Sequence, residues 1–96
     1  MYMLVSYDVS TSSEGGQRRL RQVAKVCENY GQRVQNSVFE CLLNMAQLVQ
    51  LRQALLAIID DNHDSVRIYK LGREWNEHVE HYGVKPSFDP SGPLIV

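Results

Sequence analysis

The first nine residues, MYMLVSYDV, constrain the fold of this 96-residue chain more than any other segment. Seven of the nine are apolar or aromatic, which predicts a β-strand at the centre of a sheet and covered on both faces. Asp8 is the charged exception, and an unpaired carboxylate is costly to bury. We therefore expect Asp8 to lie at the rim of the sheet, where this strand leaves the core.

Hydrophobic periodicity predicts the elements that follow. Residues 17–30 carry apolar side chains at helical spacing, with Ser12 or Ser13 as a candidate N-cap. Residues 32–43 are rich in β-branched and aromatic side chains, but their apolar phase changes near Asn36. This segment is therefore either one bent strand or two strands joined by a tight turn.

Three more elements complete the pattern. Residues 44–59 predict a second helix capped by Asn44, and residues 66–71 and 78–82 predict two more strands. The order β-α-β(β)-α-β, with a short extra C-terminal strand, is typical of an α+β, ferredoxin-like βαββαβ sandwich. In that fold a four-stranded antiparallel sheet carries both helices on one face.

The domain organisation follows from this order. We expect residues 1–84 to form the ferredoxin-like domain and residues 85–96 to form an extended tail that contains three prolines and ends in apolar residues. The tail either docks by strand addition or is a frayed end. One sheet face is left uncovered, and a domain of this size buries only about 60–68% of its unfolded surface. Both features favour a homodimer.

Composition narrows the class of protein. Apolar residues make up 44% and charged residues 22%, as in ordinary globular domains. Cys27 and Cys41 lie in apolar contexts, so we interpret them as small buried hydrophobes rather than a disulfide or a nucleophile. No apolar run approaches the ~20 residues that span a bilayer, and the N-terminus lacks the features of a secretory signal. We expect a cytoplasmic protein without a membrane partner.

Positive charge is concentrated in one part of the chain, although the net charge is only −1. Half of the ten Lys and Arg residues fall between positions 18 and 33, where Glu28 is the only acid, and they are Arg18, Arg19, Arg21, Lys25 and Arg33. This basic stretch predicts a face that binds a polyanion such as nucleic acid. The alternative is a solvated helix face opposite an apolar stripe.

Asp8 and the basic helix together suggest a phosphodiester site. The carboxylate of Asp8 can hold a hard cation such as Mg²⁺ or Mn²⁺, and the arginines can hold phosphate oxygens. One Asp rarely makes a metal site, and no second acid is near it in sequence. A homodimer that brings two copies of Asp8 to its two-fold axis would supply the second carboxylate. The alternative is a purely structural Asp8 compensated by Arg19 or Arg33.

The residues also resemble a known family. The strand ending YDV, the arginine-bearing helix and the segment QRVQNSVFECLL look like CRISPR-associated protein 2, and the similarity extends through IYKLG to the tail. The resemblance implies a ferredoxin-like homodimer in which Asp8, preceded by Tyr7, binds a divalent metal near the two-fold axis. The matching positions that it implies are the basic residues Arg19, Arg21 and Arg33 and the supporting residues Ser37 and Phe39.

The resemblance further implies a function in CRISPR adaptation. The first hypothesis is a metal-dependent endonuclease, cleaving duplex DNA or RNA, that acts with the integrase in spacer acquisition. The second is a non-catalytic, duplex-DNA-binding scaffold of the integrase complex. The third is a toxin-like messenger-RNA endoribonuclease that needs no integrase. In the first two, residues 85–96 are expected to dock on the second subunit or on the integrase.

Overall fold

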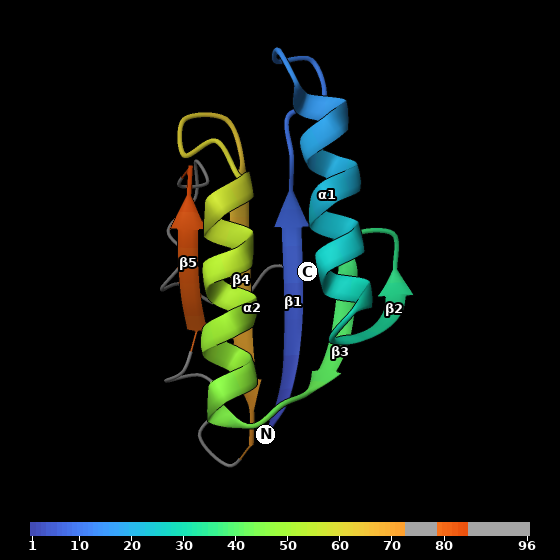
Figure 1. Ribbon diagram of the computed structural model, residues 1–96, viewed down its shortest axis with the longest axis vertical. Helices are drawn as coiled ribbons and strands as arrows, with labels where there is room; N and C mark the ends of the chain where they lie inside the picture. Colours follow the sequence, from blue (N-terminus) through green and yellow to red (C-terminus); the bar gives the residue numbers. More distant parts are fainter. Residues whose placement is uncertain (73–78, 85–96) are drawn as a thin grey trace.

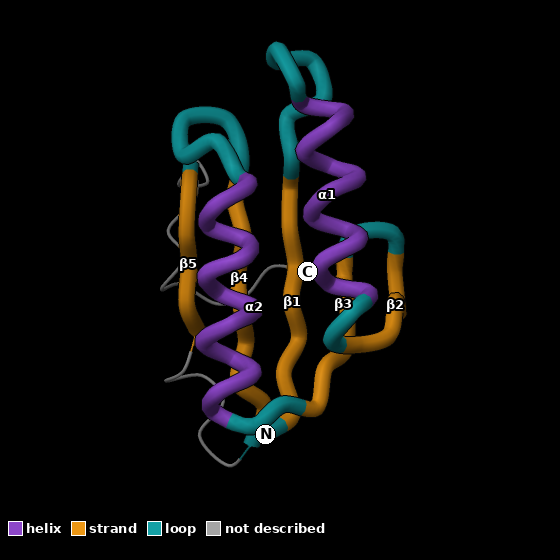
Figure 2. Tube along the Cα trace, in the orientation of Figure 1, coloured by secondary structure: helices purple, strands orange, loops and turns teal. Residues whose placement is uncertain are grey.

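The computed structural model describes residues 1–72 and 79–84, and these residues form one antiparallel sheet with two helices (Figures 1 and 2). In chain order the elements are β1 (Tyr2–Asp8), α1 (Gly16–Glu28), β2 (Gly31–Gln35), β3 (Val38–Leu42), α2 (Met45–Ile58), β4 (Ser65–Leu71) and β5 (Val79–Gly83). The predicted order of elements is confirmed, including the short extra strand. The expected tail at residues 85–96 lies outside the described residues.

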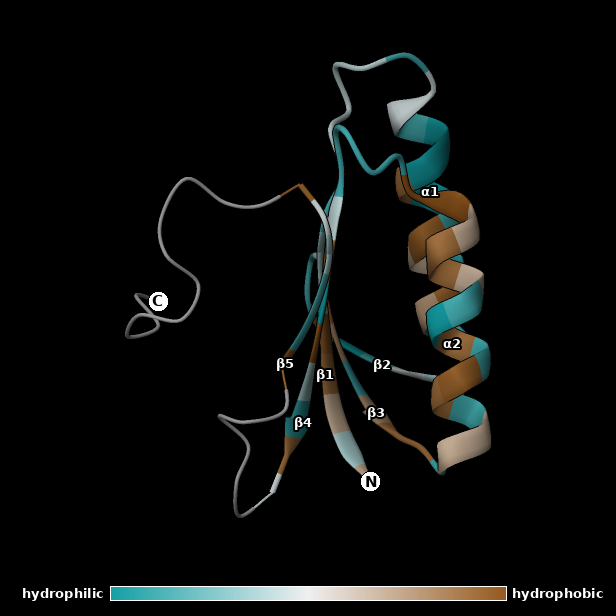
Figure 3. Cartoon of the chain, turned by 90° about the vertical axis from the view of Figure 1, so that its left-hand side faces the viewer, coloured by the Kyte–Doolittle hydropathy of each residue, from teal (hydrophilic) through white to brown (hydrophobic). Residues whose placement is uncertain are grey.

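The sheet has the strand order β2-β3-β1-β4-β5, and every neighbouring pair is antiparallel. β1 lies at the centre, between β3 and β4. Both helices pack on the same face of the sheet, as the side view shows (Figure 3). This is the ferredoxin-like arrangement predicted from the sequence, with β5 added at one edge.

Residues 32–43 form two strands, β2 and β3, joined by a turn at Asn36 and Ser37. The pairing shifts register between Arg33 and Gln35. The change of phase has a physical reason, because β3 must bury Phe39 against the helices whereas the edge strand β2 is largely exposed. The choice left open by the sequence is thereby resolved in favour of a hairpin.

The core lies between the sheet and the two helices. β1 contributes Met3, Val5 and Tyr7, which alternate along the strand and are buried. The intervening residues face the other side, which no described element covers. The prediction that β1 is covered on both faces is therefore wrong for the described part of a single chain, although its central position is confirmed.

The two helices begin in different ways. Asn44 caps α2 through a capping box, accepting from the Gln47 N–H at 2.8 Å while the Gln47 side chain accepts from the Asn44 N–H at 3.0 Å. The predicted serine cap of α1 is wrong. Its N-cap is Gly15, at φ 75°, and the Ser13 hydroxyl instead donates to the Ser10 carbonyl at 2.7 Å. Glycine tolerates this left-handed conformation without steric cost.

The edge strand β5 is fixed to α2 by an ion pair. Arg52 donates two hydrogen bonds to Glu80, at 2.8 and 2.7 Å, and the Tyr82 hydroxyl donates a third at 2.9 Å. These donors, Arg52 foremost, lower the pKa of Glu80. A bidentate guanidinium–carboxylate pair also fixes the relative orientation of its two side chains, so it holds β5 in register on this sheet.

Cys27 and Cys41 are free and buried, as the composition predicted. Burial raises the pKa of Cys27 to about 12, so its thiol is protonated at neutral pH. Nucleophilic chemistry needs the thiolate, which burial disfavours. Within residues 1–72 and 79–84, neither helix is long and apolar enough to cross a membrane.

Candidate functional site

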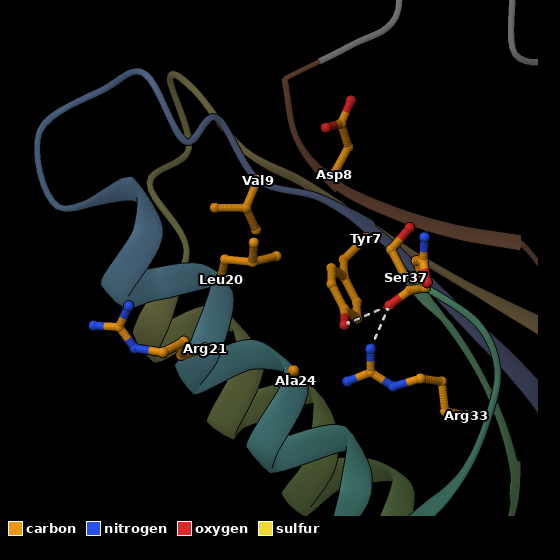
Figure 4. A pocket seen from close by; sticks show the side chains of 9 residues that line it. Tyr7, Asp8, Val9, Leu20, Arg21, Ala24, Arg33 and Ser37 are labelled. Carbon is orange, nitrogen blue, oxygen red and sulfur yellow. Dashed lines mark hydrogen bonds between the residues drawn. The ribbon is translucent and has the colours of Figure 1, made fainter.

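Asp8 is the last residue of β1, pairs with Ser65 of β4 and is exposed. Its position at the sheet rim is as predicted. Because side chains alternate along a strand, Asp8 points to the opposite face of the sheet from Tyr7. Figure 4 shows its carboxylate directed away from Tyr7 and from α1. Asp8 still lines one cavity with Arg21 of this helix and with Arg33, so the expected proximity to the arginines holds, although its carboxylate is directed away from α1.

Asp8 has no ion pair with any other residue of the described ranges 1–72 and 79–84. Arg19 pairs with Asp64, and Arg33 lies 3.4 Å from Glu28. Neither arginine compensates Asp8, which removes the basis of the purely structural alternative. An exposed carboxylate needs no partner, because water solvates it.

Arg19 differs from the other residues of the basic stretch because its contacts stabilise the fold. Its Nε donates to Oδ2 of Asp64 at 2.7 Å, and its two other nitrogens donate to the Glu14 carbonyl at 2.7 Å and to the Ser13 hydroxyl at 2.6 Å. The guanidinium is mostly buried, with 14% of the side chain exposed. Arg19 thus holds the loop between β1 and α1, with few donors left for a phosphate.

Asp64 is fully buried and was not singled out from the sequence, where it reads as part of a polar turn. Its carboxylate also accepts from the backbone N–H groups of Ser10 at 3.0 Å and Asp60 at 2.8 Å. Burial by itself raises the pKa of Asp64, but the hydrogen bonds from Arg19, Asp60 and Ser10 outweigh it, and the pKa lies below its ordinary value. Nothing in the local sequence distinguishes this acid from Asp60 or Asp61.

The other basic residues form an exposed surface, here called the basic face, which consists of Arg18, Arg21, Lys25 and Arg33. The first three lie on α1 and the last on β2. The Arg33 guanidinium lies over the Phe39 ring, 5.1 Å from its centroid, and donates to the Asn36 carbonyl at 3.0 Å. The side chain is still 45% exposed. The basic face is therefore open to a polyanion.

Tyr7, Ser37 and Phe39 support the end of β1 from the helix side. The Tyr7 and Phe39 rings stack at 6.1 Å between centroids. The backbone N–H of Tyr7 donates to the Ser37 carbonyl at 3.1 Å, which joins β1 to the hairpin turn. Burial raises the pKa of the Tyr7 hydroxyl. These contacts are structural and hold the strand that ends in Asp8.

A cavity of about 450 Å³ lies between α1, the end of β1 and the β2–β3 hairpin (Figure 4). Its lining residues are Tyr7, Asp8, Val9, Leu20, Arg21, Ala24, Arg33, Asn36 and Ser37. The cavity brings together two residues of the basic face, Arg21 and Arg33, with the supporting residues Tyr7 and Ser37. Arg18, Arg19 and Lys25 do not line it.

No group of three or more His, Cys, Asp or Glu side chains that could hold a metal ion occurs within residues 1–72 and 79–84. Asp8 offers one exposed carboxylate, which suits a hard cation but supplies too few ligands on its own. A second carboxylate has to come from outside the described part of this chain. The described residues therefore fit a metal ion only if Asp8 shares the ion with a second carboxylate from outside them.

Comparison with known proteins identifies the family. Residues 1–79 match the family model described as CRISPR associated protein Cas2. The chain belongs to the Cas2 family. A relative from Halalkalibacterium halodurans, named CRISPR-associated endonuclease Cas2, is 57% identical over 99% of both chains. Another from Nitratidesulfovibrio vulgaris, named CRISPR-associated endoribonuclease Cas2, is 54% identical over all of this chain and 94% of its own.

Solved Cas2 structures share the fold. The match with the crystal structure of Streptococcus pyogenes Cas2 at pH 6.5 spans 86% of this chain and 100% of that chain. The two chains are 52% identical, and the TM-score is 0.70. A second structure, described as cas2, covers the whole chain with a TM-score of 0.64 and 33% identity. The resemblance seen in YDV and QRVQNSVFECLL is thus confirmed for Cas2.

Proposed function

We propose that this Cas2 family member is a metal-dependent endonuclease of CRISPR adaptation that acts with the integrase in spacer acquisition. The observation that carries the proposal is the exposed, unpaired carboxylate of Asp8 at the end of the central strand. The names of the two relatives, an endonuclease and an endoribonuclease, support nuclease chemistry. The substrate class is duplex DNA or RNA.

The site requires a homodimer. The face of the sheet opposite the helices, which no other described element covers, carries neighbouring apolar side chains, because Tyr2 pairs with Leu42 on one side and Leu71 on the other. These three side chains are 48%, 68% and 40% exposed. Exposed apolar patches of this kind are typical of protein–protein interfaces. Asp8 shares this face of β1 with Tyr2, so packing two copies face to face brings two Asp8 carboxylates to the same interface.

The paired carboxylates are the proposed ligands of Mg²⁺ or another hard divalent cation such as Mn²⁺. When bound, such an ion supplies an activated water and neutralises charge on the scissile phosphate. Asp8 contributes the charge that retains the ion. The structural role of Tyr7, Ser37 and Phe39 is to hold the strand end, so that the carboxylate keeps its position.

Phosphate binding is assigned to the basic face, Arg18, Arg21, Lys25 and Arg33. Exposed guanidinium and ammonium groups bind phosphate oxygens without reading sequence. Arg19 was also expected to bind nucleic acid, but its contacts with Asp64, Ser13 and Glu14 favour an indirect role. Arg19 fixes the helix that presents its basic neighbours.

The second candidate function is a non-catalytic scaffold that holds duplex DNA for the integrase. The observation that favours it is the direction of the Asp8 carboxylate, which points away from α1 and from Tyr7 (Figure 4). The third candidate, a toxin-like messenger-RNA endoribonuclease, draws support from the name of the Nitratidesulfovibrio relative.

Cleavage assays with RNA and duplex DNA test the proposal, using wild type and Asp8→Asn with and without Mg²⁺. Metal-dependent cleavage by wild type and its loss in Asp8→Asn are expected, while sedimentation shows both proteins as dimers. Asp61→Asn, at another exposed acid, is the matched control and should cleave like wild type. Equal cleavage by Asp8→Asn would refute the catalytic role, and binding without cleavage by wild type would favour the scaffold.

The proposed integrase contact rests on residues 85–96, which lie outside the described residues. Deleting residues 90–96 should impair assembly with the integrase and leave the homodimer intact. A pull-down with the integrase compares assembly of the truncated and the full-length protein, and sedimentation compares their dimerisation. Full assembly by the truncated chain would refute the docking role.

A further inference from the structure

One arginine lies on the same face of the sheet as Asp8. Asp8 pairs with Ser65 of β4, and Ser6 pairs with Arg67. Because side chains alternate along a strand, Arg67 faces the side to which Asp8 points, opposite the two helices (Figure 3). Diagonal neighbours on adjacent strands lie about 7–8 Å apart, within reach of a long side chain. Arg67 is therefore a near neighbour of the candidate metal ligand.

The charge of Arg67 distinguishes it from the other residues of this face. Within residues 1–72 and 79–84, it is the only Lys or Arg at a strand position on this side of the sheet. The basic face lies on α1 and β2, with Arg33 directed to the helix side. Lys70 is also on the helix side, 3.7 Å from Glu80. On the side to which the Asp8 carboxylate points, Arg67 is the cation that the described strands supply.

Hydrogen bonds fix where the Arg67 side chain lies. Its Nε donates to Nδ1 of His81 at 3.1 Å, and its Nη1 donates to the Tyr69 hydroxyl at 3.4 Å. The second ring nitrogen of His81, Nε2, lies 2.9 Å from the Val84 carbonyl, which can only accept. His81 is therefore the tautomer that carries its proton on Nε2, and its Nδ1 is the acceptor for Arg67.

This arrangement suits the binding of a phosphate group. Arg67, Tyr69 and His81 are each partly exposed. The planar guanidinium matches the oxygens of a phosphate, and a side chain that is already held in place loses less conformational entropy on binding. His81 thus acts on a ligand of Arg67 without touching the ligand itself.

We propose that Arg67 is a phosphate-binding residue of the site at Asp8, and that His81 is the positioning residue that orients it. A phosphate group next to the Asp8 carboxylate accepts charge-assisted hydrogen bonds from Arg67, which offset its negative charge. The proposal rests on the proposed nuclease function. It adds two residues that belong neither to the basic face nor to the cavity beside α1.

Duplex DNA binding by Asp8→Asn in EDTA tests Arg67 without metal and without cleavage. The same substitution removes the repulsion between the Asp8 carboxylate and a phosphate. Each phosphate contact contributes about 0.9 to the slope of log K against log salt, so adding Arg67→Gln should lower the slope by about 0.9 in fluorescence anisotropy titrations. Lys70→Gln removes the same charge from the other face of β4 and is the matched control, with an unchanged slope expected.

Two substitutions at His81 test its positioning role in the same background. His81→Leu removes the acceptor for Arg67 and should weaken duplex binding about fivefold, the equivalent of one hydrogen bond. His81→Asn keeps an acceptor oxygen and should bind within about twofold of the parent protein. Both lose the bond to Val84, so a difference between them reports on the contact with Arg67. Equal binding by the two variants overturns the positioning role.

Cleavage assays separate this proposal from the proposed function. In protein that retains Asp8, Arg67→Gln should lower the cleavage rate about 100-fold, as the loss of one charge-stabilising donor does. Sedimentation and circular dichroism check that the variants fold and dimerise, and His81→Leu tests the contact if Arg67→Gln does not fold. Absence of cleavage by wild type overturns the nuclease function, while the binding titrations still decide the role of Arg67. An unchanged salt slope in folded Arg67→Gln overturns the role of Arg67 alone.

Discussion

Arg19 of α1 and Asp64, 45 residues apart in sequence, form an ion pair with 2.7 Å between Nε and Oδ2. The carboxylate also holds the backbone of Ser10, which follows β1, and of Asp60, in the loop that precedes β4. One buried acid thus joins the loop after the central strand, the basic helix and the loop before β4. Since Asp8 pairs with Ser65, the residue after Asp64, this pair also helps fix the strand end that carries the candidate site.

Removing the buried charge should destabilise the protein. Asp64→Asn leaves the Arg19 guanidinium largely buried without its counter-charge, and such losses cost about 3 kcal/mol. Urea unfolding followed by circular dichroism measures the change. Asp61→Asn, an exposed acid in the same loop, is the matched control and should stay within about 0.5 kcal/mol of wild type. Equal losses in both variants would contradict the role of the ion pair.

The same acid makes stability depend on pH in a defined direction. The pKa of Asp64 lies below its ordinary value of 3.8 in the folded protein, so the unfolded chain binds more protons in the interval between the two pKa values. Its contribution is complete above pH 3.8 and is lost as the pH falls through the folded-state pKa. Unfolding titrations from pH 7 down to about pH 2 should show this loss beginning near the pKa of an ordinary Asp and continuing below it.

Asp64→Asn supplies the control for the pH dependence. The variant should lose less stability on acidification than wild type does. Some dependence should remain, because the pKa values of Asp60 and Glu80 are lowered as well. Identical pH profiles for wild type and the variant would mean that Asp64 does not titrate with folding.

The basic face should determine the salt dependence of duplex binding. Replacing Arg18, Arg21 and Lys25 together by Gln removes up to three phosphate contacts, and each contact contributes about 0.9 to the slope of log K against log salt. The slope should therefore fall by as much as about 2.7 in fluorescence anisotropy titrations. Arg19→Gln should instead lower the unfolding free energy and keep a slope near that of wild type. An unchanged slope in the triple variant would put the nucleic acid on another surface.

The sheet face opposite the helices, left open by the described elements, should determine the oligomeric state. Leu42 is 68% exposed in the single chain, so Leu42→Lys should not disturb the core but should place a charge within the proposed interface. Sedimentation velocity should show a shift from dimer to monomer. Met45→Lys, at a side chain that is 59% exposed at the start of α2, is the control and should remain dimeric. A dimer that tolerates Leu42→Lys would require a different interface.

The sequence by itself determined the order of the elements and the family. Local periodicity encodes α1 and α2, and Asn44 with Gln47 encodes a cap whose contacts lie within one helical turn. The end of β1 at Asp8 was also predictable, because a carboxylate cannot remain in a core without a partner. The resemblance in QRVQNSVFECLL depended on residues that are close together in the chain.

Only the tertiary structure decided on which side of the sheet each functional residue lies. The run MYMLVSYDV is apolar at almost every position, so it lacks the alternation that assigns side chains to the two faces of a sheet. Only the pairing of β1 with β3 and β4 shows that Tyr7 lies inside and Asp8 outside. The tertiary structure likewise separated Arg19 from its basic neighbours, since its partner Asp64 is 45 residues away. Contacts between distant segments leave no local period in the sequence, and for that reason the face on which Asp8 lies and the partner of Arg19 became visible only in the folded chain.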